Sequence, residues 1–245
     1  MSKAGSATYF GSNSWLLEIA GLRVLVDPWL VEALVFPPGA WLLKGELQHP
    51  WPIPEQLDLL LLTQGLADHS HPPTLKRLPR SLPVVASPAA TRVVKGLGFE
   101  HVTSLQPGEQ HQIEGLNILA SAGARVPMVE NGYLLDWPGG SLYLEPHGVL
   151  DPALPNRCVN TVISPVSDLG LPLAGAFITG ASVLPQLMER FQPRQILAST
   201  TGGDVRFSGL ISRWLETSSS ATVAMPLTSA VVTPVPGQPV MLEGA

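Results

Sequence analysis

One run of residues limits the fold more than any other feature of the sequence. Leu57 to Thr63 reads LDLLLLT, and it lacks the alternation of polar and apolar residues that marks a half-exposed strand. Such a run is typical of a strand whose two faces are both buried. It ends abruptly at a polar segment, Gln64 to His71. Because α/β folds place their sites in loops at the carboxyl ends of buried strands, we expect function in this segment.

The rest of the chain predicts many short strands and few helices. Strands are predicted over residues 8–10, 15–19, 22–26, 57–63, 83–86, 101–105, 110–114, 116–121, 132–137, 141–145, 161–164 and 196–198, with 222–225 and 240–242 as edge strands or tail. Helices are predicted over 72–78, 88–97, 182–191 and 208–216. The Ala20-Gly21 link indicates a β-hairpin, and Ser87 with Pro88 indicates a helix N-cap. This order favours two packed sheets with helices outside them.

Length and charge set the class of protein. The 245 residues suit one large globular domain spanning 1–245. Acidic side chains (19) outnumber basic ones (14), which argues against a nucleic-acid binder with a basic face. The single cysteine, Cys158, excludes an internal disulfide and a cysteine-only zinc site. The first residues lack the apolar core of a signal peptide, so we expect a cytoplasmic protein.

The most apolar stretch, Leu22 to Leu43, contains charged residues and prolines. It therefore cannot supply about 20 uninterrupted residues for a transmembrane segment. Its tip, Val35 to Leu43, predicts an apolar loop. Four roles remain open for this loop: a lid over a pocket, a subunit contact, a membrane-surface patch, or simple packing on its own domain.

Ligand-type residues concentrate after the buried leucine run, at Asp68, His69 and His71. Two imidazoles and a carboxylate within four residues can bind a divalent metal, because both groups suit zinc, iron or manganese. In the alternative interpretation, Asp68 caps the short helix that begins near Pro72 and the histidines lie on the surface.

Two further strand ends carry similar residues. Glu145 and His147 follow an apolar strand and can face one cavity, although surface turns contain the same residues. Asp27 follows the strand that ends at Val26, where it either faces the same site or hydrogen-bonds neighbouring backbone amides. Glu130 or Asn131 is expected at the same rim.

Three segments in order resemble the metallo-β-lactamase superfamily, especially the branch of small metal-dependent hydrolases similar to the ascorbate-6-phosphate lactonase. They are residues 8–18, 24–29 and 59–69, and a looser likeness continues to about Trp214. The resemblance implies a four-layer αββα sandwich with the site along one edge of the two sheets. It also suggests a homo-oligomer, since relatives in this branch often associate.

The chain departs from the metal motif of that superfamily, Thr-His-x-His-x-Asp-His. The same frame here runs from Thr63 to His69, and Gln64 and Leu66 replace both leading histidines. The later segments at 121–127 and 199–201 also lack histidine, and Ser12 stands where the lactonase-like branch usually has one. The resemblance therefore implies that the first metal site is absent, while Asp68 and His69 preserve part of the second.

We expect at most one divalent metal, zinc, manganese or iron. Its predicted ligands are Asp68, His69, His71, Glu145 and His147. Asp68 and His69 are the predicted catalytic residues, with Asp68 orienting the attacking water. Substrate-binding roles are predicted for Gln64, Asp27, Arg125 and Asn131, and Arg125 would pair with a substrate carboxylate or phosphate.

The resulting hypothesis is a hydrolase acting on a small ester, lactone or phosphorylated metabolite. The alternative is a binding or scaffolding protein that keeps the fold and pocket and binds no metal. A third hypothesis is a membrane-surface protein that uses the loop around Phe36 and Trp41.

Overall fold

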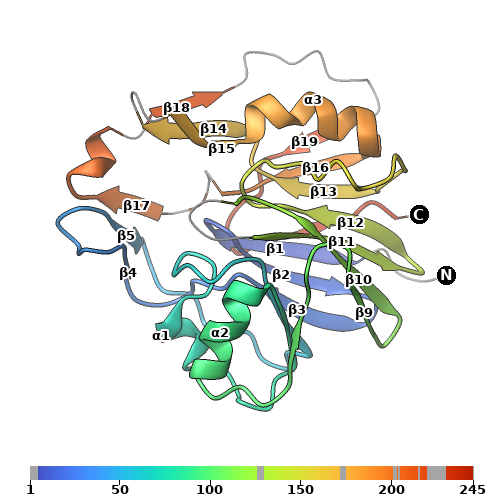
Figure 1. The fold of residues 1–245 in the computed structure, drawn as a ribbon, viewed down its shortest axis with the longest axis horizontal. Helices are drawn as coiled ribbons and strands as arrows, with labels where there is room; N and C mark the ends of the chain where they lie inside the picture. Colours follow the sequence, from blue (N-terminus) through green and yellow to red (C-terminus); the bar gives the residue numbers. More distant parts are fainter. Residues whose placement is uncertain are drawn as a thin grey trace.

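A computed structural model describes residues 5–125, 130–171, 175–200, 203, 205–214, 216–219 and 230–244. Two large sheets pack face to face, with α1 and α2 outside one sheet and α3 outside the other (Figure 1). The helix bounds are α1 Pro72–Leu75, α2 Pro88–Gly96 and α3 Gly180–Phe191. The predicted four-layer αββα sandwich is therefore confirmed.

The first sheet has the strand order β20-β1-β2-β3-β6-β7-β8. Its strands are β1 Ser6–Gly11, β2 Ser14–Ile19, β3 Leu22–Val26, β6 Leu59–Leu62, β7 Val84–Ala86, β8 Val102–Ser104 and β20 Pro239–Met241. Ala20 and Gly21 both have positive φ, 55° and 81°, as the tight turn of the predicted hairpin requires. From β3 to β8 the strands run parallel, so the loops after β3 and β6 emerge at the same edge.

The second sheet has the order β19-β16-β13-β12-β11-β10-β9. Its strands are β9 Gln110–Ile113, β10 Leu116–Ala122, β11 Asn131–Trp137, β12 Gly140–Leu144, β13 Thr161–Ser164, β16 Gln195–Ala198 and β19 Ala230–Val232. The strands β9 to β12 form the predicted antiparallel meander, and β12, β13, β16 and β19 pair in parallel. The loop after β12 and the segment before β11 consequently meet at one edge.

Two small three-stranded sheets lie beside the sandwich, β15-β14-β18 and β17-β5-β4. Their strands are β4 Leu34–Val35, β5 Lys44–Leu47, β14 Ser167–Leu171, β15 Gly175–Thr179, β17 Val205–Ser208 and β18 Glu216–Ser219. The predicted helix over 208–216 is wrong, because this segment holds the end of β17, the 3-10 turn η1 Ile211–Arg213 and the start of β18. Pairing of β17 with the distant β5 overrides the local pattern, and Gly209 breaks the chain direction with φ 109°.

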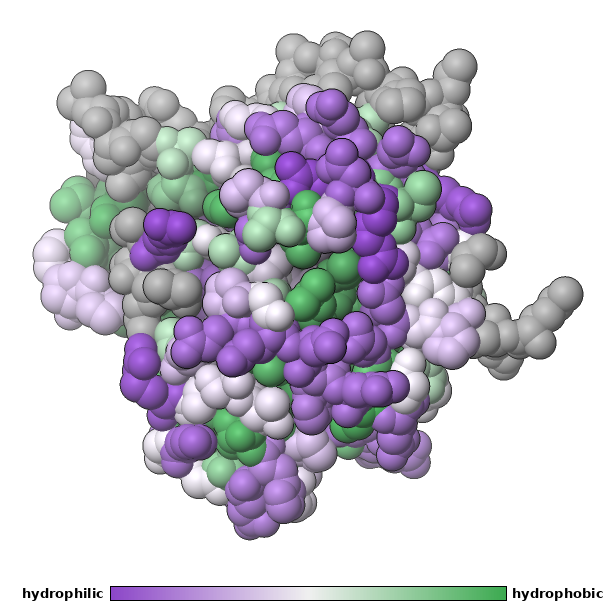
Figure 2. Space-filling view, turned by 45° about the vertical axis from the view of Figure 1, so that its right-hand side comes forward, coloured by the Kyte–Doolittle hydropathy of each residue, from purple (hydrophilic) through white to green (hydrophobic). Residues whose placement is uncertain are grey.

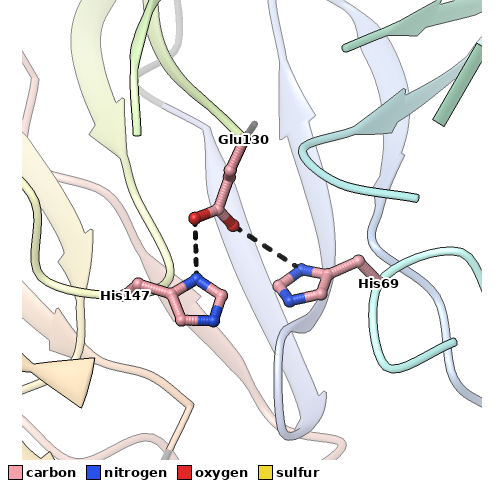
Figure 3. A group of neighbouring side chains, drawn as sticks. All are labelled: His69, Glu130 and His147. Carbon is pink, nitrogen blue, oxygen red and sulfur yellow. Dashed lines mark hydrogen bonds and ion pairs between the residues drawn. The ribbon is translucent and has the colours of Figure 1, made fainter. Parts of the chain in front are cut away.

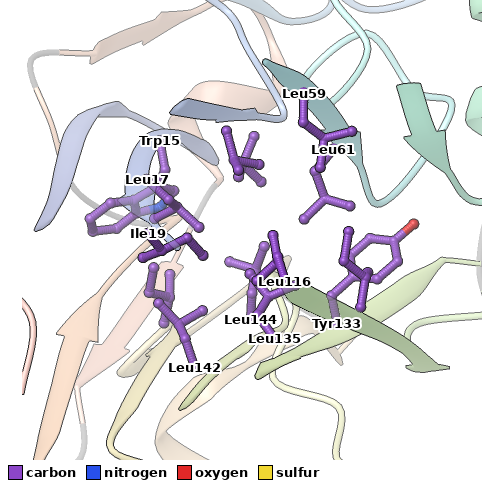
Figure 4. Close-up of a cluster of buried hydrophobic side chains, with 14 of the residues drawn as sticks. Trp15, Leu17, Ile19, Leu59, Leu61, Leu116, Tyr133, Leu135, Leu142 and Leu144 are labelled. Atoms are coloured by element: carbon purple, nitrogen blue, oxygen red, sulfur yellow. The ribbon is translucent and has the colours of Figure 1, made fainter. Parts of the chain in front are cut away.

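The main core lies between the two large sheets (Figure 4). Trp15, Leu17 and Ile19 of β2 point into it, as does every second residue of β6, while Leu60 and Leu62 pack on the helix side with α1 and α2. All four leucines of β6 are fully buried, which confirms the strand predicted to be covered on both faces. A separate cluster, with Val183, Leu187 and Phe191, packs α3 onto the second sheet.

The surface carries scattered apolar side chains. On the face drawn in Figure 2, polar and apolar residues are interspersed and no broad apolar area appears. The predicted apolar loop exposes Trp41 (65%), and its backbone is held by hydrogen bonds from the amides of Leu210 and Ile211 to the carbonyls of Trp41 and Leu42. Among the described residues, no helix combines the length and the apolar character needed to cross a bilayer.

Candidate metal centre

Two histidines from different sheets meet at one edge of the sandwich. His69 lies in the loop after β6 of the first sheet, and His147 lies in the loop after β12 of the second. Their ring centroids are 5.3 Å apart, with 29° between the ring planes. Glu130, directly before β11, sits between them (Figure 3). The sandwich therefore assembles from separate loops a group that no short motif contains.

His69 is held by contacts on both ring nitrogens. Its Nδ1 lies 2.8 Å from Asp27 Oδ2 and, because a carboxylate only accepts, Nδ1–H donates this hydrogen bond. Its Nε2 lies 3.3 Å from Asp68 Oδ2 and 3.3 Å from Asn13 Nδ2. Burial alone would lower the pKa of His69, but the charges of Asp68 and Asp27 raise it well above its ordinary value.

Asp27 fixes this histidine to the first sheet. It follows β3 with φ 40°, and its carboxylate accepts hydrogen bonds from the amide and the hydroxyl of Thr63. Burial raises the pKa of Asp27, although His69 and Thr63 oppose the shift. Asp27 thus both satisfies a backbone amide and orients His69, and its side chain is buried behind the imidazole.

Asp68 is the more accessible carboxylate, with 19% of its side chain exposed. Burial tends to raise the pKa of Asp68, but the charge and hydrogen bond of His69 outweigh it, so the pKa is lowered. Asp68 is therefore ionised at neutral pH.

His147 has a carboxylate partner of its own. Its Nδ1 lies 2.7 Å from Glu130 Oε2. Burial would lower the pKa of His147, whereas the charge and hydrogen bond of Glu130 raise it. The predicted ligand Glu145 instead accepts hydrogen bonds from the backbone amides of His147 and Val149, so it shapes the loop that carries His147. Burial and the nearby charge of Glu130 raise the pKa of Glu145 to about 8.

The other predicted site residues lie at varying distances from this group. His71 occupies the N-cap position of α1 without a side-chain capping hydrogen bond, and its Nδ1 contacts Thr74 Oγ1 at 3.0 Å. The structure does not bring it to the other histidines. Gln64 is fully buried in the loop after β6. The side chain of Asn131 donates to the carbonyl of Leu105 and to the Tyr133 hydroxyl. Arg125 is exposed on the loop that leads from β10 toward Glu130.

Comparison with known proteins identifies the family. A model described as a beta-lactamase superfamily domain matches residues 6–199. The chain belongs to the beta-lactamase superfamily. None of the curated proteins matches the chain.

Solved structures share the fold of this superfamily member. An isothiocyanate hydrolase from Delia radicum gut bacteria is 17% identical, with 80% of this chain and 84% of that chain covered and a TM-score of 0.63. A possible metal-dependent hydrolase from Veillonella parvula is 13% identical, with 97% and 99% covered and a TM-score of 0.66. CmlA, a diiron beta-hydroxylase from Streptomyces venezuelae, is 18% identical, with 83% and 46% covered and a TM-score of 0.58.

The residues of this beta-lactamase superfamily member fit a cation. Ligand atoms of His69, Glu130 and His147 lie within 4.8 Å of one another. Asp68 Oδ1 and Glu130 Oε1 are buried and have no hydrogen-bond partner within the described parts of the chain. Buried carboxylate oxygens without partners are costly, and a nearby cation with its bound water would reduce that cost. Imidazole and carboxylate together suit zinc, iron and manganese.

Four of the predicted site residues, His69, His147, Asp27 and Asp68, lie together at this edge, and each follows a strand end. Glu130 or Asn131 is predicted at the rim, but nothing in the sequence pairs Glu130 with a histidine. The contact of Glu130 with His147 spans 17 residues and depends on the register of β11 and β12. A carboxylate directly before a buried strand was the signal that could have found it.

Proposed function

We propose that this protein is a hydrolase that uses one divalent cation, zinc, manganese or iron, to cleave a small ester, lactone or phosphorylated metabolite. One observation carries the proposal: His69 and His147 each place Nδ1 on a buried carboxylate, and Nε2 of His69 lies 3.3 Å from Asp68, which is the third proposed ligand. Metal-binding histidines almost always have such a partner on the second ring nitrogen, because it fixes the tautomer and the ring orientation.

The proposed ligands are Nε2 of His69, Nε2 of His147 and the carboxylate of Asp68. Asp27 and Thr63 hold His69 in place, while Glu145 holds the backbone amide of His147. This ligand set is narrower than the predicted one, because Glu145 is engaged with backbone amides and His71 with Thr74. When bound, a divalent cation supplies a Lewis acid that polarises a carbonyl or phosphoryl oxygen.

Asp68 has a second role in the proposal. Its Oδ1 has no partner among the described residues, and the lowered pKa keeps the carboxylate ionised. It therefore accepts a hydrogen bond from the attacking water and orients it. On the substrate side, the exposed Arg125 pairs with a carboxylate or phosphate of the substrate.

Hydrolysis assays test this function. Protein treated with a chelator is assayed with and without added zinc, manganese or iron on small esters, lactones and phosphodiesters. We expect added metal to restore hydrolysis in wild type and in His71→Ala. We expect no hydrolysis in His147→Ala after metal is added. Hydrolysis that persists after chelation would overturn the proposal, as would its absence in every metal-loaded sample.

A non-catalytic binding protein is the second candidate, and one observation favours it. The raised pKa of His69 favours an imidazolium between Asp27 and Asp68, and its positive charge offsets one of the two negative charges without a metal. Gln64 and Leu66 also carry no imidazole for a further ion. This candidate predicts that a small molecule which raises the Tm of wild type binds Asp68→Ala and His69→Ala equally well. A large loss of that binding would exclude it.

A further inference from the structure

Glu130 is a buried carboxylate directly before β11. Its side chain is fully buried, and its backbone amide and carbonyl both pair across the loop, with the carbonyl of Ala124 and the amide of Gly123. A Cβ at position 123 would lie 3.1 Å from Glu130 Cγ, so a glycine there leaves room for the carboxylate. The backbone pairing and the glycine at 123 therefore accommodate the Glu130 side chain at this edge.

The two oxygens of this carboxylate face different histidines. Oε2 accepts the hydrogen bond of His147 Nδ1 at 2.7 Å and one from the Ala124 amide at 3.3 Å. Oε1 lies 4.0 Å from His69 Nδ1 and has no hydrogen bond to another described residue. Glu130 thus bonds one imidazole directly and contributes negative charge beside the other.

Glu130 repeats on the second sheet the arrangement that Asp27 makes on the first. Asp27 and His69 belong to loops after β3 and β6, while Glu130 and His147 flank β11 and β12. The Nδ1–carboxylate distances are 2.8 Å and 2.7 Å. Each sheet therefore supplies one histidine with its own carboxylate.

We propose that Glu130 is a positioning residue that fixes the tautomer and orientation of His147, so that Nε2 of this ring faces the site. The inference rests on the proposed function, since a presented Nε2 serves a cation. Glu145 cannot take this role, because its oxygens are engaged with the amides of His147 and Val149.

The first test reads the imidazole directly and needs no metal. In metal-free wild type at pH 7, nitrogen NMR of the histidine side chains should show that Nδ1 of His147 carries a proton. This proton should exchange slowly with water, and its chemical shift should reflect the hydrogen bond to a carboxylate. Glu130→Gln should change this signal and leave the Nδ1 signal of His69 bonded to Asp27. His147→Ala assigns the resonance. An unchanged His147 signal in Glu130→Gln would overturn the proposal.

The second test measures Co²⁺ affinity by competition with a chelating dye. Glu130→Gln should weaken binding by about 10- to 100-fold, and Glu130→Asp should recover part of the loss. Asp136→Asn is the matched control, because Asp136 lies on the same strand and pairs with Arg157; as a substitution outside the site, it should stay within about twofold of wild type. Binding by Glu130→Gln equal to wild type would contradict the proposal.

Two further measurements distinguish failure of the positioning proposal from unfolding of the variants and from failure of the proposed metal function. Thermal unfolding of the metal-free variants shows whether Glu130→Gln and Glu130→Asp are folded, and a loss of affinity shared by both in proportion to lost stability counts against positioning. Wild type that binds no Co²⁺ would refute the metal function alone, while the NMR comparison would still decide whether Glu130 fixes His147.

Discussion

The rings of His69 and His147 lie 5.3 Å apart between centroids and 29° from parallel, although the two residues follow strands of different sheets. Their arrangement therefore depends on how the sheets pack. The backbone contributes to this link, because the Asn131 amide donates to the Thr63 carbonyl at 3.0 Å. A backbone hydrogen bond therefore joins the two sheets at the edge where the site lies.

Removing the charge of Asp27 tests the link between His69 and the first sheet. Asp27→Asn should lower Co²⁺ affinity by about 10- to 100-fold, because His69 loses its orienting carboxylate. It should also lower the free energy of unfolding by about 1–3 kcal/mol, since the buried Thr63 amide and hydroxyl lose their charged partner. Dye competition and urea unfolding measure the two effects. Asp58→Asn, at an exposed carboxylate near the start of β6, is the control and should change neither.

The metal-free protein should lose stability as pH rises above neutrality. The carboxylates Asp68 and Glu130 raise the pKa values of His69 and His147 against the effect of burial, and the pKa of Glu145 is raised to about 8. A group with a raised pKa binds its proton more tightly in the folded state, so its contribution disappears as pH passes through the folded-state pKa.

We therefore expect the Tm of chelator-treated protein to fall between about pH 6.5 and pH 9. In a chain of this size, each 1 kcal/mol lost lowers Tm by about 2–4 °C. Glu145→Gln should flatten part of this slope, because the amide does not titrate. A Tm that rises with pH over this range in metal-free wild type would contradict the assigned pKa directions.

Gly65 should be needed for the position of the loop after β6. A Cβ at this residue would lie 2.8 Å from the backbone carbon and oxygen of Ala89 in α2, so the loop or the helix must shift. Gly65→Ala should cost about 1–3 kcal/mol of stability and weaken metal binding, because the same loop carries His69.

Gly96 offers the matched control on α2. A Cβ there meets nothing within 4 Å, so Gly96→Ala should be neutral or stabilise by about 0.4–1 kcal/mol without changing metal affinity. Urea unfolding and dye competition compare the two variants. Equal stability of Gly65→Ala and wild type would show that the loop is not set by this contact.

Much of the fold could be predicted because local patterns agree with it. The Ala20-Gly21 hairpin, the buried β6 strand and the Ser87 cap of α2 all follow from neighbouring residues, and Ser87 Oγ accepts from the Ala90 amide as expected. The predicted helix over 208–216 failed, because β17 forms by pairing with β5, more than 150 residues earlier. Such non-local pairing leaves no periodic signal.

The site was predictable only in part for the same reason. Strand ends identify Asp27, Asp68, His69 and His147 individually. Their pairing depends on the register between strands and on the packing of the two sheets, which also separates His71 from the group and turns Glu145 toward backbone amides. Those relations become visible only in three dimensions.

The central claim is that one divalent cation binds at this edge, and metal content tests it most directly. Untagged wild type and the Asp68→Ala, His69→Ala double variant are exchanged into zinc, manganese or iron, desalted and measured by elemental analysis. We predict about one equivalent of metal per chain in wild type and none in the double variant. A wild type that stays metal-free with all three ions, or a double variant that retains the metal, would contradict the claim.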